Sequence, residues 1–180
     1  VPGNMIEQAR LVLGQRRQIF FVAIGGFDNH DGLIGSDATN GAHANRLAEV
    51  NSGLTFFWDA LGDIGMRDSV TTFTASDFGR TYVSNGDGSD HGWGADHIVM
   101  GGSQLAGGRM AGTYPSVTPG GADDARENGR LIPTTSVDAY SFEIAKWLGV
   151  PLSEAGTVFP NLTRFLDPFN PATHLGLLSG

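Results

Sequence analysis

The sequence predicts an α/β fold in which helices cover both faces of a mostly parallel sheet. Apolar runs rich in β-branched and aromatic residues alternate along the chain with stretches in which apolar residues recur every three or four positions. The continuous apolar run at 19–24 also lacks the polar alternation of a half-exposed strand, which is typical of a strand buried on both faces. Together these patterns predict a three-layer α/β/α domain.

The first half of the chain predicts a strand–helix–strand unit. Residues 5–13 carry apolar positions near helical spacing, and the central strand at 19–24 follows. A long helix comes next and ends at Gly65, and the β-branched run at 70–75 is the second strand. Strands joined by a helical crossover normally pair in parallel. The apolar stripe of the long helix is Leu47, Val50, Leu54, Phe57, Leu61 and Ile64.

The middle of the chain predicts little regular structure. Residues 78–93 are rich in glycine and are expected to form a loop. A short strand is predicted at 97–100 and a weaker one at 109–114, before an irregular stretch that reaches Arg130.

A second helix and a tail follow. Ser136 is the expected N-cap, and Gly149 closes a helix whose apolar stripe begins at Val137. Residues 152–180 have no regular period and are expected to wrap the surface. We interpret residues 1–180 as a single domain.

Composition and charge exclude several classes of function. With 180 residues and 40% hydrophobic content the chain can bury a core, whereas a formal charge of -8 argues against nucleic-acid or anionic-membrane partners. The absence of cysteine excludes disulfides, thiol nucleophiles and cysteine-ligated zinc. No apolar run approaches the ~20 residues of a membrane span. The start at Val1, without an initiator methionine, indicates a processed product or a fragment.

Three turns with acidic or imidazole side chains follow strand-like runs or lie in the glycine-rich loop. The first turn carries Asp28 and His30, the second carries Asp77 and Arg80, and the third carries His91. Ligands of α/β sheets bind at the carboxyl ends of the strands, so we expect these side chains to converge. Oxygen and nitrogen ligands of this kind suit a divalent metal.

Simpler interpretations of these turns stay open. Asp28 can cap its own turn with His30 in solvent, and Asp77 can cap a turn or form an ion pair with Arg80. The loop 85–92 also resembles a calcium loop, although it lacks the terminal bidentate glutamate.

The remaining histidines predict less. His43 begins a helix, His97 fits a packed position, and His174 is expected in solvent. The sequence contains no recognisable nucleophile elbow, phosphate loop or dinucleotide fingerprint.

Four segments, read in order, resemble the C-terminal half of a large bacterial family. The segments are Gly-Gly-Phe-Asp-Asn-His, Phe-Thr-Ala-Ser-Asp-Phe-Gly-Arg-Thr, Ser-Asp-His-Gly-Trp-Gly and Arg-Leu-Ile-Pro-Thr-Thr-Ser-Val-Asp. The family is catalogued as domain of unknown function 1501 and is placed in the alkaline phosphatase and sulfatase superfamily. The similarity covers about residues 15–165.

The resemblance implies an alkaline-phosphatase-like sheet that carries two adjacent divalent metals. By the order of the superfamily motifs, Asp28, His30 and His91 would hold one metal and Asp77 would belong to the second. Phe78 stands where the histidine of the second site is expected, and Asp28 and His30 are closer in sequence than the usual pair. The resemblance therefore implies a single-metal or altered site.

The resemblance also implies a protein partner. In the superfamily the nucleophile and a further metal-binding aspartate come from an N-terminal half, to which no segment of this sequence corresponds. We therefore expect either a separate N-terminal piece, a homo-oligomer, or a truncated module. The resemblance further suggests a periplasmic or secreted location.

The expected function is metal-dependent hydrolysis of a small phosphate or sulfate ester. The metal ligands would be Asp28, His30, Asp77 and His91, with zinc favoured over calcium, magnesium or manganese. Arg80 is the candidate catalytic residue, because its planar guanidinium suits a tetrahedral anion. Two alternatives are a non-catalytic metal- or ligand-binding module and a hydrolase of carbohydrate or carboxyl esters.

Overall fold

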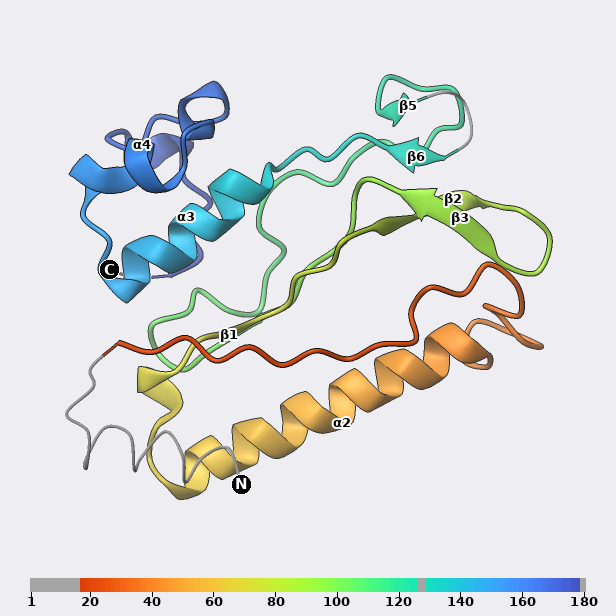
Figure 1. Ribbon diagram of the computed structural model, residues 1–180, viewed down its shortest axis with the longest axis horizontal. Coiled ribbons are helices and arrows are strands. Elements are labelled where there is room, and N and C mark those ends of the chain that lie inside the picture. The colour runs from red at the N-terminus through yellow and green to blue at the C-terminus, as the bar shows by residue number, and fades with distance from the viewer. Residues whose placement is uncertain (1–16, 126–128, 179–180) are drawn as a thin grey trace.

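The computed structural model describes residues 17–125 and 129–178, which form an α/β structure with short strands (Figure 1). The predicted apolar stretch at 5–13 lies outside the described residues. The α-helices are α2 (Ala42–Asp63), α3 (Val137–Leu148) and α4 (Ala155–Val158). The strands are β1 (Thr72–Phe73), β2 (Gly79–Ser84), β3 (Ser89–Gly92), β4 (Val99–Met100), β5 (Asp124–Ala125) and β6 (Arg130–Leu131).

The strand ladders within the described residues are antiparallel, so the predicted mostly parallel sheet with three layers is not observed there. β1 pairs with β4, β2 with β3, and β5 with β6, each as a two-stranded ladder. The physical reason lies in the connections. Between β1 and β4 the chain makes a hairpin and no helical crossover, so β4 returns beside β1 in the opposite direction.

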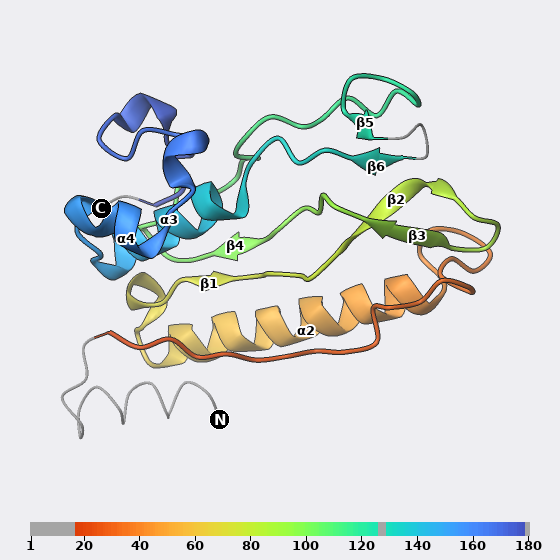
Figure 2. The ribbon, with the colours of Figure 1, turned by 45° about the horizontal axis from the view of Figure 1, so that its top comes forward.

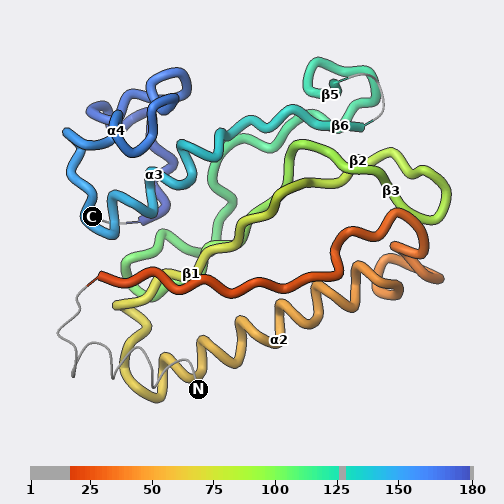
Figure 3. Tube along the Cα trace, viewed as in Figure 1, coloured from red at the N-terminus to blue at the C-terminus, as the bar shows by residue number. Residues whose placement is uncertain are grey.

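The predicted central strand at 19–24 is extended but is not a buried strand. Its backbone forms no ladder with other described residues, and Phe21 and Val22 are 91% and 83% exposed. The segment runs beside α2 toward the β2–β3 hairpin (Figures 2 and 3). Residues of this type favour extended backbone, but a strand becomes buried only when neighbouring strands cover it. The expectation of burial on both faces is therefore wrong for this segment.

The long helix is confirmed. α2 contains the predicted apolar stripe as far as Leu61, and Ile64 is its C-cap. Gly65 follows with a positive φ of 64°, a conformation that glycine adopts at low cost. Leu61 is the one buried residue of the helix; of the rest of the stripe Leu47 is exposed and the other members are half-buried. None of the helices in residues 17–125 and 129–178 has the length and apolarity needed to cross a membrane.

α3 and the C-terminal tail form the main hydrophobic core. The Ser136 hydroxyl accepts a hydrogen bond from the Ala139 amide at 3.1 Å, and Gly149 ends α3 in the left-handed conformation, as predicted. The prediction that the tail has no regular structure is wrong, because it contains α4 and the 3-10 helices η2 (Leu152–Glu154), η3 (Leu162–Arg164) and η4 (Pro171–Thr173). The core consists of Ala139, Phe142, Ala155, Leu162 and Leu166, with Phe159 packed against it.

The predicted loop at 78–93 is instead the β2–β3 hairpin, and the predicted weaker strand at 109–114 does not form. The hairpin is contacted on one side by β6 and by Gly129, the residue before it. The Tyr82 amide donates to the Gly129 carbonyl at 3.1 Å, and Arg130 Nε donates to the carbonyl of His91 at 3.0 Å. These contacts fix the strand that carries the candidate site.

Candidate metal centre

The loop that follows the extended 19–24 segment lies directly against the β2–β3 hairpin. The Leu33 amide donates to the Asp87 carbonyl at 3.0 Å, and the Gly32 amide donates to Asp87 Oδ2 at 3.0 Å. Gly88 permits this approach, because a Cβ atom at that position would lie 1.9 Å from the His30 carbonyl oxygen. The absence of a side chain at Gly88 thus allows the His30 loop to lie against the hairpin.

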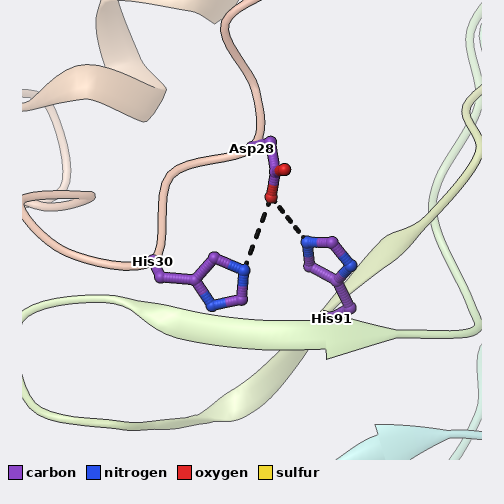
Figure 4. Close-up of side chains that lie close together, drawn as sticks. All are labelled: Asp28, His30 and His91. Carbon is purple, nitrogen blue, oxygen red and sulfur yellow. Dashed lines mark hydrogen bonds and ion pairs between the residues drawn. The ribbon is translucent and has the colours of Figure 1, made fainter.

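Asp28, His30 and His91 converge at this contact (Figure 4). Asp28 Oδ1 lies 2.7 Å from His91 Nε2 and 3.4 Å from His30 Nε2. One ligand atom from each residue lies within 4.8 Å of the others, although Asp28 and His91 are 63 positions apart in sequence. Three of the four predicted ligands therefore form one cluster that can hold a metal ion.

Ring stacking fixes the orientation of the His91 imidazole. The Phe78 ring lies parallel to it, with the centroids 4.0 Å apart and an interplanar angle of 6°. The His30 ring stacks on the same imidazole at 4.8 Å with an angle of 30°. Phe78, which cannot itself coordinate a metal, thus holds the His91 ring in place.

The charge distribution favours an ionised carboxylate at the cluster. The hydrogen bond from His91 holds the pKa of Asp28 below its usual value of 3.8, and the nearby His30 and Arg80 lower this pKa further. Partial desolvation of the carboxylate acts in the opposite direction. The side chains of Asp28, His30 and His91 are 66%, 47% and 43% exposed, so an ion held there would remain open to solvent and substrate. An open position of this kind is typical of catalytic zinc sites.

Asp90 supports the cluster from the next position of β3, a role that the sequence did not indicate. Its Oδ1 lies 3.4 Å from His30 Nδ1 and accepts a hydrogen bond from Asn85 Nδ2 at 3.2 Å. A carboxylate on the far nitrogen of a ligand histidine orients the ring toward the metal. The Asp-His dipeptide in the sequence was the available signal, but only the fold shows that Asp90 contacts His30.

The structure does not bring Asp77 into the cluster. Its side chain is exposed, and the group of potential ligands found within the described residues contains only Asp28, His30 and His91. No ion pair joins Asp77 to Arg80 in the part of the chain that the structure describes.

Arg80 connects the two segments that carry the ligands. Its Nη1 donates to the Ser89 carbonyl at 2.7 Å, and its Nη2 donates to the Phe27 carbonyl at 2.5 Å. The guanidinium also lies 5.3 Å from the centroid of the Phe78 ring. Arg80 therefore fixes the residue before Asp28 against the strand that carries His91.

The remaining histidines lie outside the cluster. His97 stacks on Tyr140 at 5.5 Å, and His43 packs edge-on against Phe27 at 6.4 Å. The expectation that His174 lies in solvent is wrong. Its side chain is 7% exposed, because the tail folds back onto α3.

Comparison with known proteins places the chain in a family. The sequence model of the family described as protein of unknown function (DUF1501) matches residues 4–137. No curated protein and no solved structure matches the chain. The match extends over the first predicted turn, the hairpin and the start of α3. The chain therefore belongs to the DUF1501 family.

Proposed function

We propose that this chain is a metal-dependent hydrolase of phosphate or sulfate esters. Its divalent cation, most favourably zinc, is held by Asp28, His30 and His91. The observation that carries the proposal is that one ligand atom of each of these three side chains lies within 4.8 Å of the other two. The side chains come from two segments that are far apart in the sequence and meet only in the folded chain.

The donor set fits zinc. One carboxylate oxygen and two imidazole nitrogens, with no thiolate, match the three protein ligands of many hydrolytic zinc sites. The cluster also has an outer carboxylate of the kind that such sites use, since Asp90 Oδ1 lies 3.4 Å from the far nitrogen of His30. Calcium, magnesium and manganese prefer oxygen ligands, so two histidines favour zinc over all three.

In this proposal the bound cation, Arg80 and Phe78 have different roles. A bound divalent cation supplies a Lewis acid that polarises an ester oxygen and lowers the pKa of water. Arg80 positions the Asp28 loop by donating hydrogen bonds to the carbonyls of Phe27 and Ser89. A guanidinium has five N–H donors, so three remain for the oxygens of a tetrahedral ester. Phe78 excludes a second set of ligands from the far side of His91, so we propose a single metal and no direct role for Asp77.

Membership of the alkaline phosphatase and sulfatase superfamily, with its parallel sheet, is part of the same proposal. The extended apolar segment at 19–24 supports it, because that segment has the geometry and composition of a strand but no ladder among the described residues. A separate N-terminal piece or a second copy of the chain would provide the neighbouring strand. The same relationship leads us to propose an exported protein.

One observation favours a second candidate, a non-catalytic metal-binding module. Among the described residues, no serine or threonine hydroxyl is hydrogen-bonded to Asp28, His30 or His91. The centre therefore has no evident protein nucleophile, and water must serve if the chain is an enzyme.

Metal titration with paired histidine variants tests the proposal. Zinc and cobalt are titrated into metal-free protein by calorimetry and visible spectroscopy, and turnover is measured on nitrophenyl phosphate, sulfate, acetate and glycoside. We expect one metal per chain. His91→Ala should weaken metal binding by at least about tenfold and abolish turnover. His97→Ala removes an imidazole that stacks on Tyr140 outside the cluster, and it should change neither metal binding nor turnover.

The outcomes separate the candidates. Metal binding that depends on His91 without turnover of any ester selects the binding module. Turnover of the acetate or glycoside alone selects the hydrolase of carboxyl or carbohydrate esters. Metal affinity unchanged in His91→Ala contradicts the metal centre itself.

A further inference from the structure

The turn of the β2–β3 hairpin contains an asparagine that is followed directly by glycine. Such a pair is prone to lose the side-chain amide, because glycine has no Cβ to shield its backbone nitrogen from the neighbouring carboxamide. Three pairs of this kind occur in the sequence, Asn40-Gly41, Asn85-Gly86 and Asn128-Gly129, and Asn128 lies outside the described residues. In the hairpin both Asn85 and Gly86 are exposed, so water has access to the pair.

The backbone of the hairpin turn can reach the reactive geometry at low cost. The peptide group between residues 85 and 86 must rotate until the Gly86 nitrogen faces the Asn85 side chain. Among the described residues the Asn85 carbonyl accepts no hydrogen bond, and the Gly86 amide donates to the Ser84 hydroxyl at 3.1 Å. Rotation of this peptide group therefore breaks one hydrogen bond, which water can replace at an exposed position.

The side chain of Asn85 joins the hairpin to the loop that carries Asp28 and His30. Its Nδ2 donates to the His30 carbonyl at 3.3 Å and to Asp90 Oδ1 at 3.2 Å. A carboxylate in place of this amide has no hydrogen to donate and would face two oxygen acceptors. Loss of the amide therefore replaces two attractive contacts between the loop and the hairpin with repulsive ones.

The pair Asn40-Gly41 has the same sequence but is held more firmly. The Asn40 carbonyl accepts the Gly35 amide at 2.7 Å, and Asn40 Nδ2 donates to both carboxylate oxygens of Asp37 at 2.9 Å. Gly41 is the N-cap of α2 and packs closely against the backbone of residues 33–35. Rotation of the peptide group after Asn40 would therefore disturb the start of α2, and Asn40 serves as an internal control.

We propose that Asn85 is a site of spontaneous deamidation, and that this modification loosens the loop at 28–33 from the β2–β3 hairpin. The Gly86 nitrogen gives up its proton and bonds to Asn85 Cγ, while the Cγ–Nδ2 bond breaks and Nδ2 leaves as ammonia. Water then opens the cyclic imide at either carbonyl carbon and leaves aspartate or isoaspartate. Isoaspartate also lengthens the backbone of the turn, which the hydrogen bond from the Asn85 amide to the Gly88 carbonyl closes at 3.2 Å. The reaction needs no metal, so the inference goes beyond the proposed function.

Peptide mapping of protein aged in mildly alkaline buffer tests the modification site. Mass spectrometry identifies the modified asparagine, and ion exchange separates the product, which carries one negative charge beyond the formal -8. We expect Asn85 to react at least about fivefold faster than Asn40, because the hydrogen bonds that hold Asn40 are shorter and fix its backbone. Asn85→Gln keeps the amide but can close only a larger ring that forms more slowly, so ageing should leave this position intact.

Amide hydrogen exchange measures the loosening of the loop. Gly32 and Leu33 donate their backbone amides to Asp87, so their exchange reports whether the loop stays against the hairpin. Asn85→Asp supplies the product carboxylate directly and should speed this exchange about fivefold, the effect of one lost hydrogen bond. Asn161→Asp adds the same charge at an exposed position without a side-chain cap, and it should leave the exchange unchanged.

The outcomes separate this inference from the proposed function. Absence of reaction at Asn85, or reaction at Asn40 before Asn85, overturns the assignment of the modification site. Unchanged exchange of Gly32 and Leu33 in Asn85→Asp overturns the loosening. Zinc affinity is measured on the same samples, and faster exchange with unchanged zinc affinity supports this inference while it contradicts the place of His30 in the proposed metal centre.

Discussion

Replacing Gly88 with alanine should push the metal-site loop away from the hairpin. A Cβ at this position would lie 1.9 Å from the His30 carbonyl oxygen and 2.7 Å from its carbonyl carbon. Real Cβ contacts are not shorter than 3.0 Å, so the loop must move by at least 1.1 Å. The φ of Gly88 is not positive, so alanine can adopt the backbone conformation at this position. The expected effect of the substitution therefore comes from the collision between the new Cβ and the His30 carbonyl.

A displacement of this size is large on the scale of metal coordination. Ligand distances tolerate about 0.2 Å and functional geometry about 0.5 Å, so His30 would leave the coordination sphere. We expect Gly88→Ala to weaken zinc binding by at least about ten- to a hundredfold, the range seen when the support of a ligand is lost. Calorimetric titration measures the change, and circular dichroism verifies that the helices persist.

The control glycine, Gly25, lies three residues before Asp28. A Cβ at Gly25 meets no atom within 4 Å and Gly25 has no positive φ, so Gly25→Ala should bind zinc as the parent protein does. If Gly88→Ala binds zinc with undiminished affinity, His30 is not a ligand held by this contact, and the reasoning that connects the hairpin glycine to the centre is wrong.

Two further variants probe the frame around the centre. Ser136→Ala removes the hydroxyl that caps α3 and should lower the free energy of unfolding by about 1 kcal/mol in a denaturant titration. The control is Ser153→Ala, at an exposed serine in η2, which should leave the free energy of unfolding unchanged. Burial holds the pKa of His97 below its usual 6.5, against the charge of Asp96. The unfolded chain therefore takes up this proton at higher pH than the folded one, and stability falls as pH drops below 6.5. His97→Gln should reduce the loss of unfolding free energy between about pH 7.5 and about pH 5.5, and an equal loss in both proteins would contradict this assignment.

The helices could be predicted from the sequence because their signals are local. The apolar period of α2, the Ser136 cap and the left-handed Gly149 each act within a few residues. The proximity of Asp28, His30 and His91 agrees with the grouping that the family resemblance implied, whereas the placement of the turns alone also predicted Asp77 beside them.

The strand pairing could not be predicted, because pairing depends on neighbours far along the chain. The segment 19–24 has the composition of a buried strand, but composition does not supply the strands that would cover it. The β2–β3 hairpin reads as a loop in the sequence because the four residues Asn85–Gly88 are turn formers and their neighbours Ser84 and Ser89 are polar, although Asn-Gly is itself a hairpin signal. The core role of Leu162 depends on a tail without apolar period that folds back onto α3.

The exposed segment at 19–24 has a consequence for handling the protein. Ile19, Phe21 and Val22 are each more than three-quarters exposed, and the six-residue stretch contains no charge and no proline. Stretches of this composition aggregate by edge-to-edge pairing when concentrated. We therefore expect the isolated chain to precipitate at high concentration, and a lysine at Phe21, the most exposed of these positions, to keep it in solution.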